Sequence, residues 1–133
     1  MKKTLLALTL CAASLAHAGP RGWIDFYQEQ SMKKIELCQL TYSVAWSEAS
    51  YYEKGNECVA SGKEQIKSWY SQALGQVSKG AREPFKNHLI KTLAALESSR
   101  PSESETRGAY SARTSRIQEG LNEAWVRFDL EQQ

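Results

Sequence analysis

The sequence predicts an all-α fold, a four-helix up-and-down bundle with one irregular segment held by a disulfide. Three observations support this prediction. Apolar side chains recur at steps of three and four residues, serine-glutamate pairs open two of the helical stretches, and glycines or prolines separate the stretches. The chain of 133 residues keeps 115 of them, residues 19–133, once the leader described below is removed. That length suits a single domain with one core.

The first predicted helix extends from Ser31 to Tyr52. The periodic pattern also continues backwards to about Trp23, whereas Gly55 and Asn56 interrupt it after its end. Because an α-helix has about 3.6 residues per turn, residues that recur at these steps lie on a single face. The face consists of small, apolar and aromatic side chains, namely Ser31, Ile35, Cys38, Tyr42, Ala45, Ala49 and Tyr52.

The second predicted helix opens with Ser61 as a cap and Glu64 three residues later, and Gly80 is expected to end it. The third helix has Pro84 in its first turn and ends before Pro101. Both helices carry apolar faces. The face of the second consists of Ile66, Tyr70, Ala73 and Val77 with Trp69 and Leu74 beside it, and that of the third consists of Phe85, Leu89, Leu93 and Leu96.

The fourth predicted helix opens with a second capping pair, Ser102 and Glu105. Gly108 and Gly120 weaken it, because a glycine in a helix interior is less favourable than an alanine by about 1 kcal/mol. Its apolar face is nevertheless continuous. That face consists of Tyr110, Ile117, Leu121, Ala124, Trp125 and Phe128.

Two cysteines remain in the predicted mature chain, Cys38 and Cys58, and we expect them to form a disulfide. The alternatives are an intermolecular bridge or a metal pair, which would lack further ligands. If the first helix ends at Tyr52, an extended return of residues 53–60 brings Cys58 back level with Cys38. The sequence therefore predicts an irregular segment over 53–60 that runs along the first helix, with the second helix starting at Gly62.

The first 18 residues have the three parts of a cleavable export signal. Lys2 and Lys3 come first, an apolar run of about eleven residues follows, and small residues lead up to Ala18. The run is well short of the roughly 20 residues that span a bilayer. We therefore expect cleavage after Ala18, loss of Cys11 with the leader, and a periplasmic or secreted protein that does not span the membrane.

Removing Lys2 and Lys3 leaves 15 of the 17 basic residues, against 15 acidic ones. A neutral chain lacks the excess of clustered basic residues that a nucleic-acid footprint needs, so we expect no nucleic-acid partner. The Cys-x-x-Cys-His motif of covalent haem attachment is missing from the sequence. We expect no cofactor and no metal.

Catalytic side chains are sparse in the expected mature chain. His88 is its single histidine, and its place near the start of the third helix predicts a helix-surface or edge position. Glu119 and Glu123 lie one turn apart, but Arg116 and Arg127 flank them, which favours a solvated, ion-paired face. No catalytic residue is therefore assigned.

The sequence favours a non-catalytic, protein-binding factor of the inhibitor or immunity type, whose partner is another envelope protein. One alternative is a small periplasmic hydrolase that uses carboxylates. The other is a structural or stress protein of the envelope that associates with itself. The hydrolase would be favoured by a pocket that joins two glutamates from the set Glu36, Glu48, Glu119 and Glu123.

The candidate partner-binding residues are Trp46, Tyr51 and Tyr52, which lie beside the predicted irregular segment. Loops on a rigid support often carry function, and Trp and Tyr are enriched at binding hot spots. The first helical face places Tyr52 towards the core and leaves Tyr51 outside it. The competing interpretation is that Trp46 and Tyr52 are simply part of the core.

Overall fold

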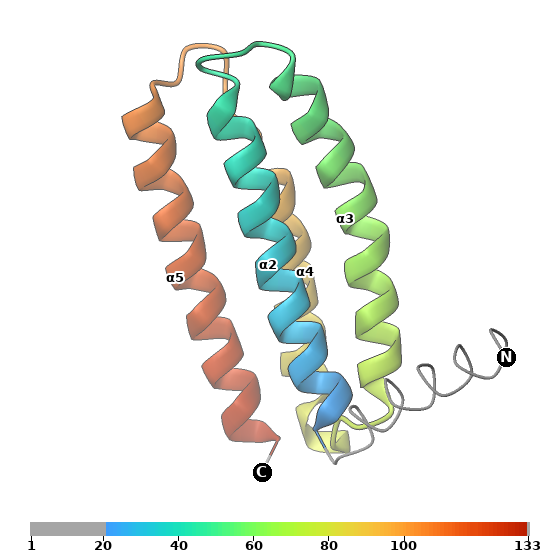
Figure 1. Cartoon of the computed structure of the whole chain (residues 1–133). Helices are drawn as coiled ribbons and strands as arrows, with labels where there is room; N and C mark the ends of the chain where they lie inside the picture. The colour runs from blue at the N-terminus through green and yellow to red at the C-terminus, as the bar shows by residue number, and fades with distance from the viewer. Residues whose placement is uncertain (1–20, 133) are drawn as a thin grey trace, which may run out of the picture.

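The computed structural model describes residues 21–132, which form four α-helices and one short 3-10 helix. Successive helices run antiparallel, so that the α2–α3 and α4–α5 connections lie at one end of the bundle (Figure 1). The predicted up-and-down bundle is confirmed. The predicted leader, residues 1–18, lies outside the described residues. The elements are α2 (Gly22–Val44), α3 (Tyr51–Leu74), η1 (Lys79–Ala81), α4 (Arg82–Glu97) and α5 (Arg107–Glu131).

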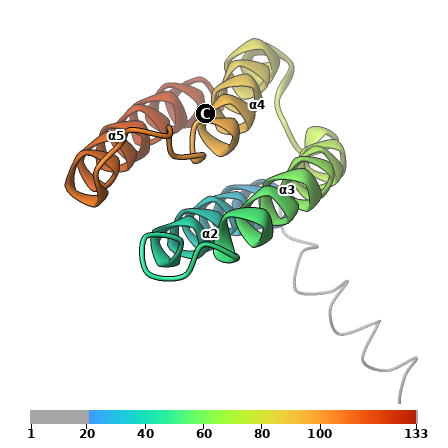
Figure 2. The same ribbon diagram turned by 90° about the horizontal axis from the view of Figure 1, so that it is seen from above.

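The helices form two layers, each a helical hairpin (Figure 2). Helices α2 and α3 pack closely along one hairpin, and α4 and α5 along the other. The layers are joined mainly through α3 and α4, whereas the seam between α2 and α5 is looser. None of the helices within residues 21–132 combines the length and the apolar content needed to cross a bilayer.

The core contains side chains from all four helices and confirms most of the predicted apolar faces. Aromatic rings occupy its centre: the Tyr27 ring lies 5.0 Å from that of Phe85, which lies 4.8 Å from that of Phe128. Leu89 and Leu93 of the predicted third face lie only at the edge of the core. The residues of the predicted faces that are large and fully buried are Ile35, Cys38, Tyr42, Ile66, Phe85, Leu96 and Phe128. Ile24 and Tyr27 of α2 are fully buried as well.

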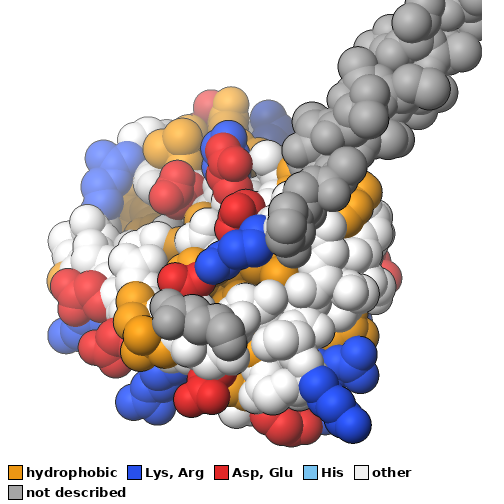
Figure 3. All heavy atoms as spheres, turned by 90° about the horizontal axis from the view of Figure 1, so that it is seen from below, with side chains coloured by type: hydrophobic (Ala, Val, Ile, Leu, Met, Phe, Trp, Pro, Cys, Tyr) orange, Lys and Arg blue, Asp and Glu red, His pale blue; other side chains and the backbone are white. Residues whose placement is uncertain are grey.

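The end of the bundle at which α2 begins and α5 ends carries acidic and basic side chains intermixed (Figure 3). Arg21 forms ion pairs with Asp129 of α5 and with Asp25, one turn along α2. The Ser78 backbone N–H donates to Gln132 Oε1 at 2.9 Å, which ties the α3–α4 connection to the end of α5. This end is thus held by polar contacts between elements.

The predicted disulfide between Cys38 and Cys58 is confirmed, with 5.5 Å between the Cα atoms. The predicted irregular segment over 53–60 is wrong, because α3 begins at Tyr51 and both 53–60 and Gly62 lie inside it. Helix α2 ends at Val44, eight residues before the predicted Tyr52, and a turn over 45–50 reverses the chain. Since this turn lies midway between the cysteines, two antiparallel helices bring them level. Closing this loop contributes about 3 kcal/mol in the chain-entropy model.

Gly55 does not break the helix as its sequence context predicted. It is buried in α3 where the Tyr42 ring of α2 crosses it. A Cβ atom at Gly55 would lie 2.7 Å from Tyr42 Cζ and nearer still to two other ring carbons. The Tyr42 ring cannot easily move, because it is fully buried and its hydroxyl donates to Asn56 Oδ1 at 2.7 Å. The glycine is therefore needed for the close approach of α2 and α3.

We expect Gly55→Ala to destabilise the protein although alanine is the better helix former. The propensity gain is about 1 kcal/mol, whereas overpacking a core contact costs about 1–3 kcal/mol. The matched control is Gly120→Ala in α5, where a new Cβ atom meets nothing within 4 Å and the propensity gain remains. Urea unfolding should show opposite signs for the two variants. Equal stabilisation by both would show that the contact of Gly55 with Tyr42 is easily relieved.

Two predicted helix starts are also wrong. Ser61 lies inside α3, and its hydroxyl donates to the Cys58 carbonyl at 3.2 Å. Helix α5 begins at Arg107 rather than after Ser102, and its cap is Thr106, whose side chain accepts from the Ala109 N–H at 3.1 Å. Helix α3 ends at Leu74, before the predicted stop at Gly80, whereas Pro84 lies in the first turn of α4 as predicted. The spacing of serine and glutamate alone therefore does not identify where these two helices begin.

Candidate functional site

The three candidate partner-binding residues do not share one site, because only Trp46 and Tyr52 line the same hollow. Trp46 lies half-buried in the α2–α3 turn, and Tyr52 lies in the first turn of α3 with 41% of its surface exposed. Tyr51 is half-buried, with Lys54 Nζ 4.1 Å from the centre of its ring. The expected orientations of the two tyrosines are therefore not found, because α3 starts a new helix after the turn and does not continue the face of α2.

Trp46 and Tyr52 line one hollow of about 390 Å³ at the loop end of the bundle, which we call the bundle-end hollow. Tyr51 is not among its lining residues. The α2–α3 and α4–α5 connections, distant in sequence, meet here (Figure 1). The first connection contributes Ala45 and Trp46, and the adjoining first turn of α3 contributes Tyr52. The second connection contributes Pro101, Ser102, Glu103 and Glu105.

Both aromatic walls of the bundle-end hollow are held in place. The Trp46 indole N–H donates to the Glu105 carbonyl at 3.3 Å, and its ring lies 5.1 Å from that of Tyr110 in α5. The Tyr52 ring packs edge-on against the buried Tyr42 ring at 5.6 Å. Tyr42 in turn is on α2, close to the disulfide at Cys38. The walls are thus attached to both hairpins.

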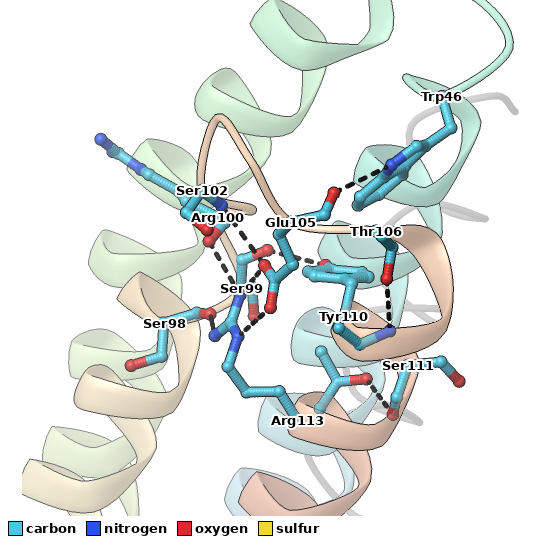
Figure 4. A network of polar contacts seen from close by, with 12 residues as sticks. Trp46, Ser98, Ser99, Arg100, Ser102, Glu105, Thr106, Tyr110, Ser111 and Arg113 are labelled. Atoms are coloured by element: carbon cyan, nitrogen blue, oxygen red, sulfur yellow. Dashed lines mark hydrogen bonds and ion pairs between the residues drawn. The ribbon is translucent and has the colours of Figure 1, made fainter.

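The second connection is held by Arg113, which reaches from α5 into the loop (Figure 4). Its guanidinium contacts both carboxylate oxygens of Glu105, at 2.8 and 2.9 Å. It also donates to the Ser98 carbonyl and, at 3.0 Å, to the Arg100 carbonyl. The hydrogen bonds from Arg113 hold the pKa of the Glu105 carboxyl below its ordinary value. Such bidentate pairs are geometrically specific, so they fix the loop on the helix.

Tyr110 closes the same network from the buried side (Figure 4). Its hydroxyl donates to the Ser99 carbonyl at 2.7 Å, and burial raises its pKa above the ordinary tyrosine value. The sequence predicted Tyr110 in the core and Glu103 and Glu105 at the start of a helix, where the helix dipole accounts for their charge. It assigned Arg113 no role. Helical periodicity does not reveal this network, because Glu105 lies in the loop before the helix that carries Arg113.

The predicted surface position of His88 is wrong, since only 1% of it is exposed. The buried face of α4 passes through Phe85, His88 and Thr92 rather than through Leu89. The Tyr27 hydroxyl lies 2.9 Å from His88 Nδ1, while Nε2 has no hydrogen-bond partner among the described residues. Burial, with a smaller contribution from Lys91, lowers the pKa of His88 to about 4. The ring is therefore neutral at pH 7 and belongs to the core.

Two of the glutamates considered for hydrolysis do line one hollow. Glu36 of α2 and Glu119 of α5 share a shallow hollow of about 410 Å³ along the loose α2–α5 seam. Both side chains are exposed, as are Glu48 and Glu123, which lie elsewhere. Within residues 21–132, no group of three or more His, Cys, Asp and Glu side chains is placed to hold a metal ion. The hollow of Glu36 and Glu119 is otherwise lined by Gln39, Thr114, Ser115 and Gln118.

Comparisons of the chain with known protein families, with characterised proteins and with solved structures give no significant match.

Proposed function

We propose that this chain is an exported, non-catalytic binding protein that contacts another protein of the periplasm through its bundle-end hollow. The observation that carries the proposal is the meeting of two distant connections, which places Trp46 and Tyr52 on one hollow. Side chains of these two types supply much of the binding free energy at protein interfaces. The contacts of Glu105, Arg113 and Tyr42 hold the walls before binding, which reduces the entropy lost on association.

Export rests on the pattern of residues 1–18 and is tested together with binding. The protein should be purified from a periplasmic extract, where an intact mass that begins at Gly19 supports the proposal. The oxidised protein is then immobilised and used to capture proteins from an envelope extract. A product that retains residues 1–18 would contradict the proposed location.

Tyr52→Ala is expected to weaken binding of the captured partner by about fivefold or more, because it removes an exposed aromatic wall of the bundle-end hollow. Tyr51→Ala is the matched control, since it removes the same side chain one residue away and outside that hollow. Affinity is measured by titration of the purified partner, with urea unfolding to check that both variants remain folded. Equal binding by wild type and Tyr52→Ala would exclude this hollow as the contact.

The second candidate function is a carboxylate-dependent hydrolase, which the shared hollow of Glu36 and Glu119 favours. Hydrolysis by two carboxylates usually needs one of them kept protonated by a buried environment, and both are exposed here. The binding proposal therefore ranks first. Hydrolysis of an envelope glycan or peptide that is lost in both Glu36→Gln and Glu119→Gln, but not in Glu123→Gln, would reverse this order.

A further inference from the structure

We propose that the bundle-end hollow accepts a cationic side chain, a lysine or an arginine, from the partner. This inference rests on the proposed function, since it names the chemistry of the group that enters the same hollow. The lining combines two aromatic rings, Trp46 and Tyr52, with the carboxylates of Glu103 and Glu105 and contains no basic residue. A cation over an aromatic ring is attracted by its negative face, and a carboxylate nearby adds to that attraction.

The two carboxylates differ in how far their charge is already compensated. Glu105 is held in two contacts by Arg113, and only a tenth of its side chain is exposed. Glu103 is exposed and forms no ion pair with any residue between 21 and 132. The negative charge available to a ligand therefore comes from Glu103.

The basic side chains near the lining residues in the sequence contact other groups. Arg100, which precedes Pro101, has its Nε 3.8 Å from Glu97 Oε2. Arg107 donates to the Ser43 carbonyl at 2.9 Å near the end of α2, and Lys54 lies over the Tyr51 ring. Arg113 is committed to Glu105 and to two backbone carbonyls. None of these residues lines the bundle-end hollow. An incoming cation consequently meets no like charge on the lining.

The hydrogen-bonding character of the lining points to the same class of ligand. The Trp46 indole N–H already donates to the Glu105 carbonyl, so it is not available to an anionic group. An acidic side chain would face Glu103 without a basic partner. An apolar side chain would desolvate a carboxylate without replacing its hydrogen bonds, which is unfavourable. A lysine or arginine satisfies both the rings and the carboxylate.

The test uses blocked tripeptides, acetyl-Gly-X-Gly-amide, in which X is arginine, lysine, norleucine or glutamate. They are titrated into the mature, oxidised protein while the indole N–H resonance of Trp46, assigned with Trp46→Phe, is followed by NMR. We expect the arginine and lysine peptides to shift this resonance in a saturable way that weakens with added salt. The norleucine and glutamate peptides should leave it in place. Equal shifts with all four peptides, or none with the basic ones, would overturn the inference.

Glu103→Gln and Tyr52→Leu should each weaken binding of the arginine peptide about threefold, because each removes one of the two attractions. Glu119→Gln is the matched control, an exposed glutamate that lies outside the bundle-end hollow. Unchanged peptide affinity in Glu103→Gln would show that the Glu103 carboxylate does not attract the cation, which contradicts the inference. Partner capture that depends on Tyr52 while the basic peptides fail to bind would leave the proposed function standing and refute only this inference.

Discussion

Phe128→Ala is expected to lower the free energy of unfolding by about 3–5 kcal/mol. Phe128 is fully buried in α5, and its ring lies 4.8 Å from that of Phe85 and 4.9 Å from that of Trp125. The Phe85 ring in turn lies 5.0 Å from that of Tyr27 on α2 and 4.8 Å from that of Tyr70 on α3. The cluster therefore links the two hairpins, and its members cannot close a cavity without moving a helix. Urea unfolding at pH 7 measures the loss. A loss below about 1 kcal/mol would show that α5 is not packed as the structure has it.

A matched pair of leucines on the same helix provides the control for this result. Leu121 is 3% exposed and Leu130 is 64% exposed. Leu121→Ala should cost about 2–5 kcal/mol, whereas Leu130→Ala should change stability by no more than about 0.5 kcal/mol. Because the substitution and the helix are the same, the difference reports burial alone. Similar losses for both would mean that Leu130 is covered in solution, as self-association would require.

Acidification from pH 7.5 to pH 5 is expected to lower stability by about 2 kcal/mol through His88. The pKa of His88 is lowered from 6.5 to about 4 in the folded protein, so the unfolded chain takes up its proton first. The stabilisation is therefore complete above pH 6.5 and is lost as the pH falls towards 4. Glu29 and Glu105, whose pKa values are lowered from 4.5, contribute mainly below this window.

The variant His88→Gln separates this effect from other titrations, because glutamine keeps a polar side chain beside Tyr27 but does not ionise. Its stability should change little between pH 7.5 and pH 5. Where that variant fails to fold, the Cε1 proton of His88 in the wild-type protein provides an independent NMR titration. A titration midpoint near 6.5 would contradict the buried, neutral ring.

Much of the core was predictable from the sequence, because helical periodicity is a local property. Ile35, Cys38 and Tyr42 on α2 and Leu121 and Phe128 on α5 recur at steps that any α-helix places on one face. The number of helices followed from the same steps, and the cysteine pairing followed from the presence of two cysteines in the expected mature chain. Neither the number of helices nor the cysteine pairing depends on which helices are neighbours.

The rest was decided by contacts between helices. The sequence predicted that Gly55 breaks a helix, but the Tyr42 ring packed against it makes it the residue that α3 needs. The sequence predicted that His88 lies at the surface, but the hydroxyl of Tyr27, 61 residues away, gives its ring a polar partner in the core. The bundle-end hollow likewise exists only because two distant connections meet at one end. Such positions depend on a partner from another helix, and side-chain periodicity within one helix contains no information about that partner.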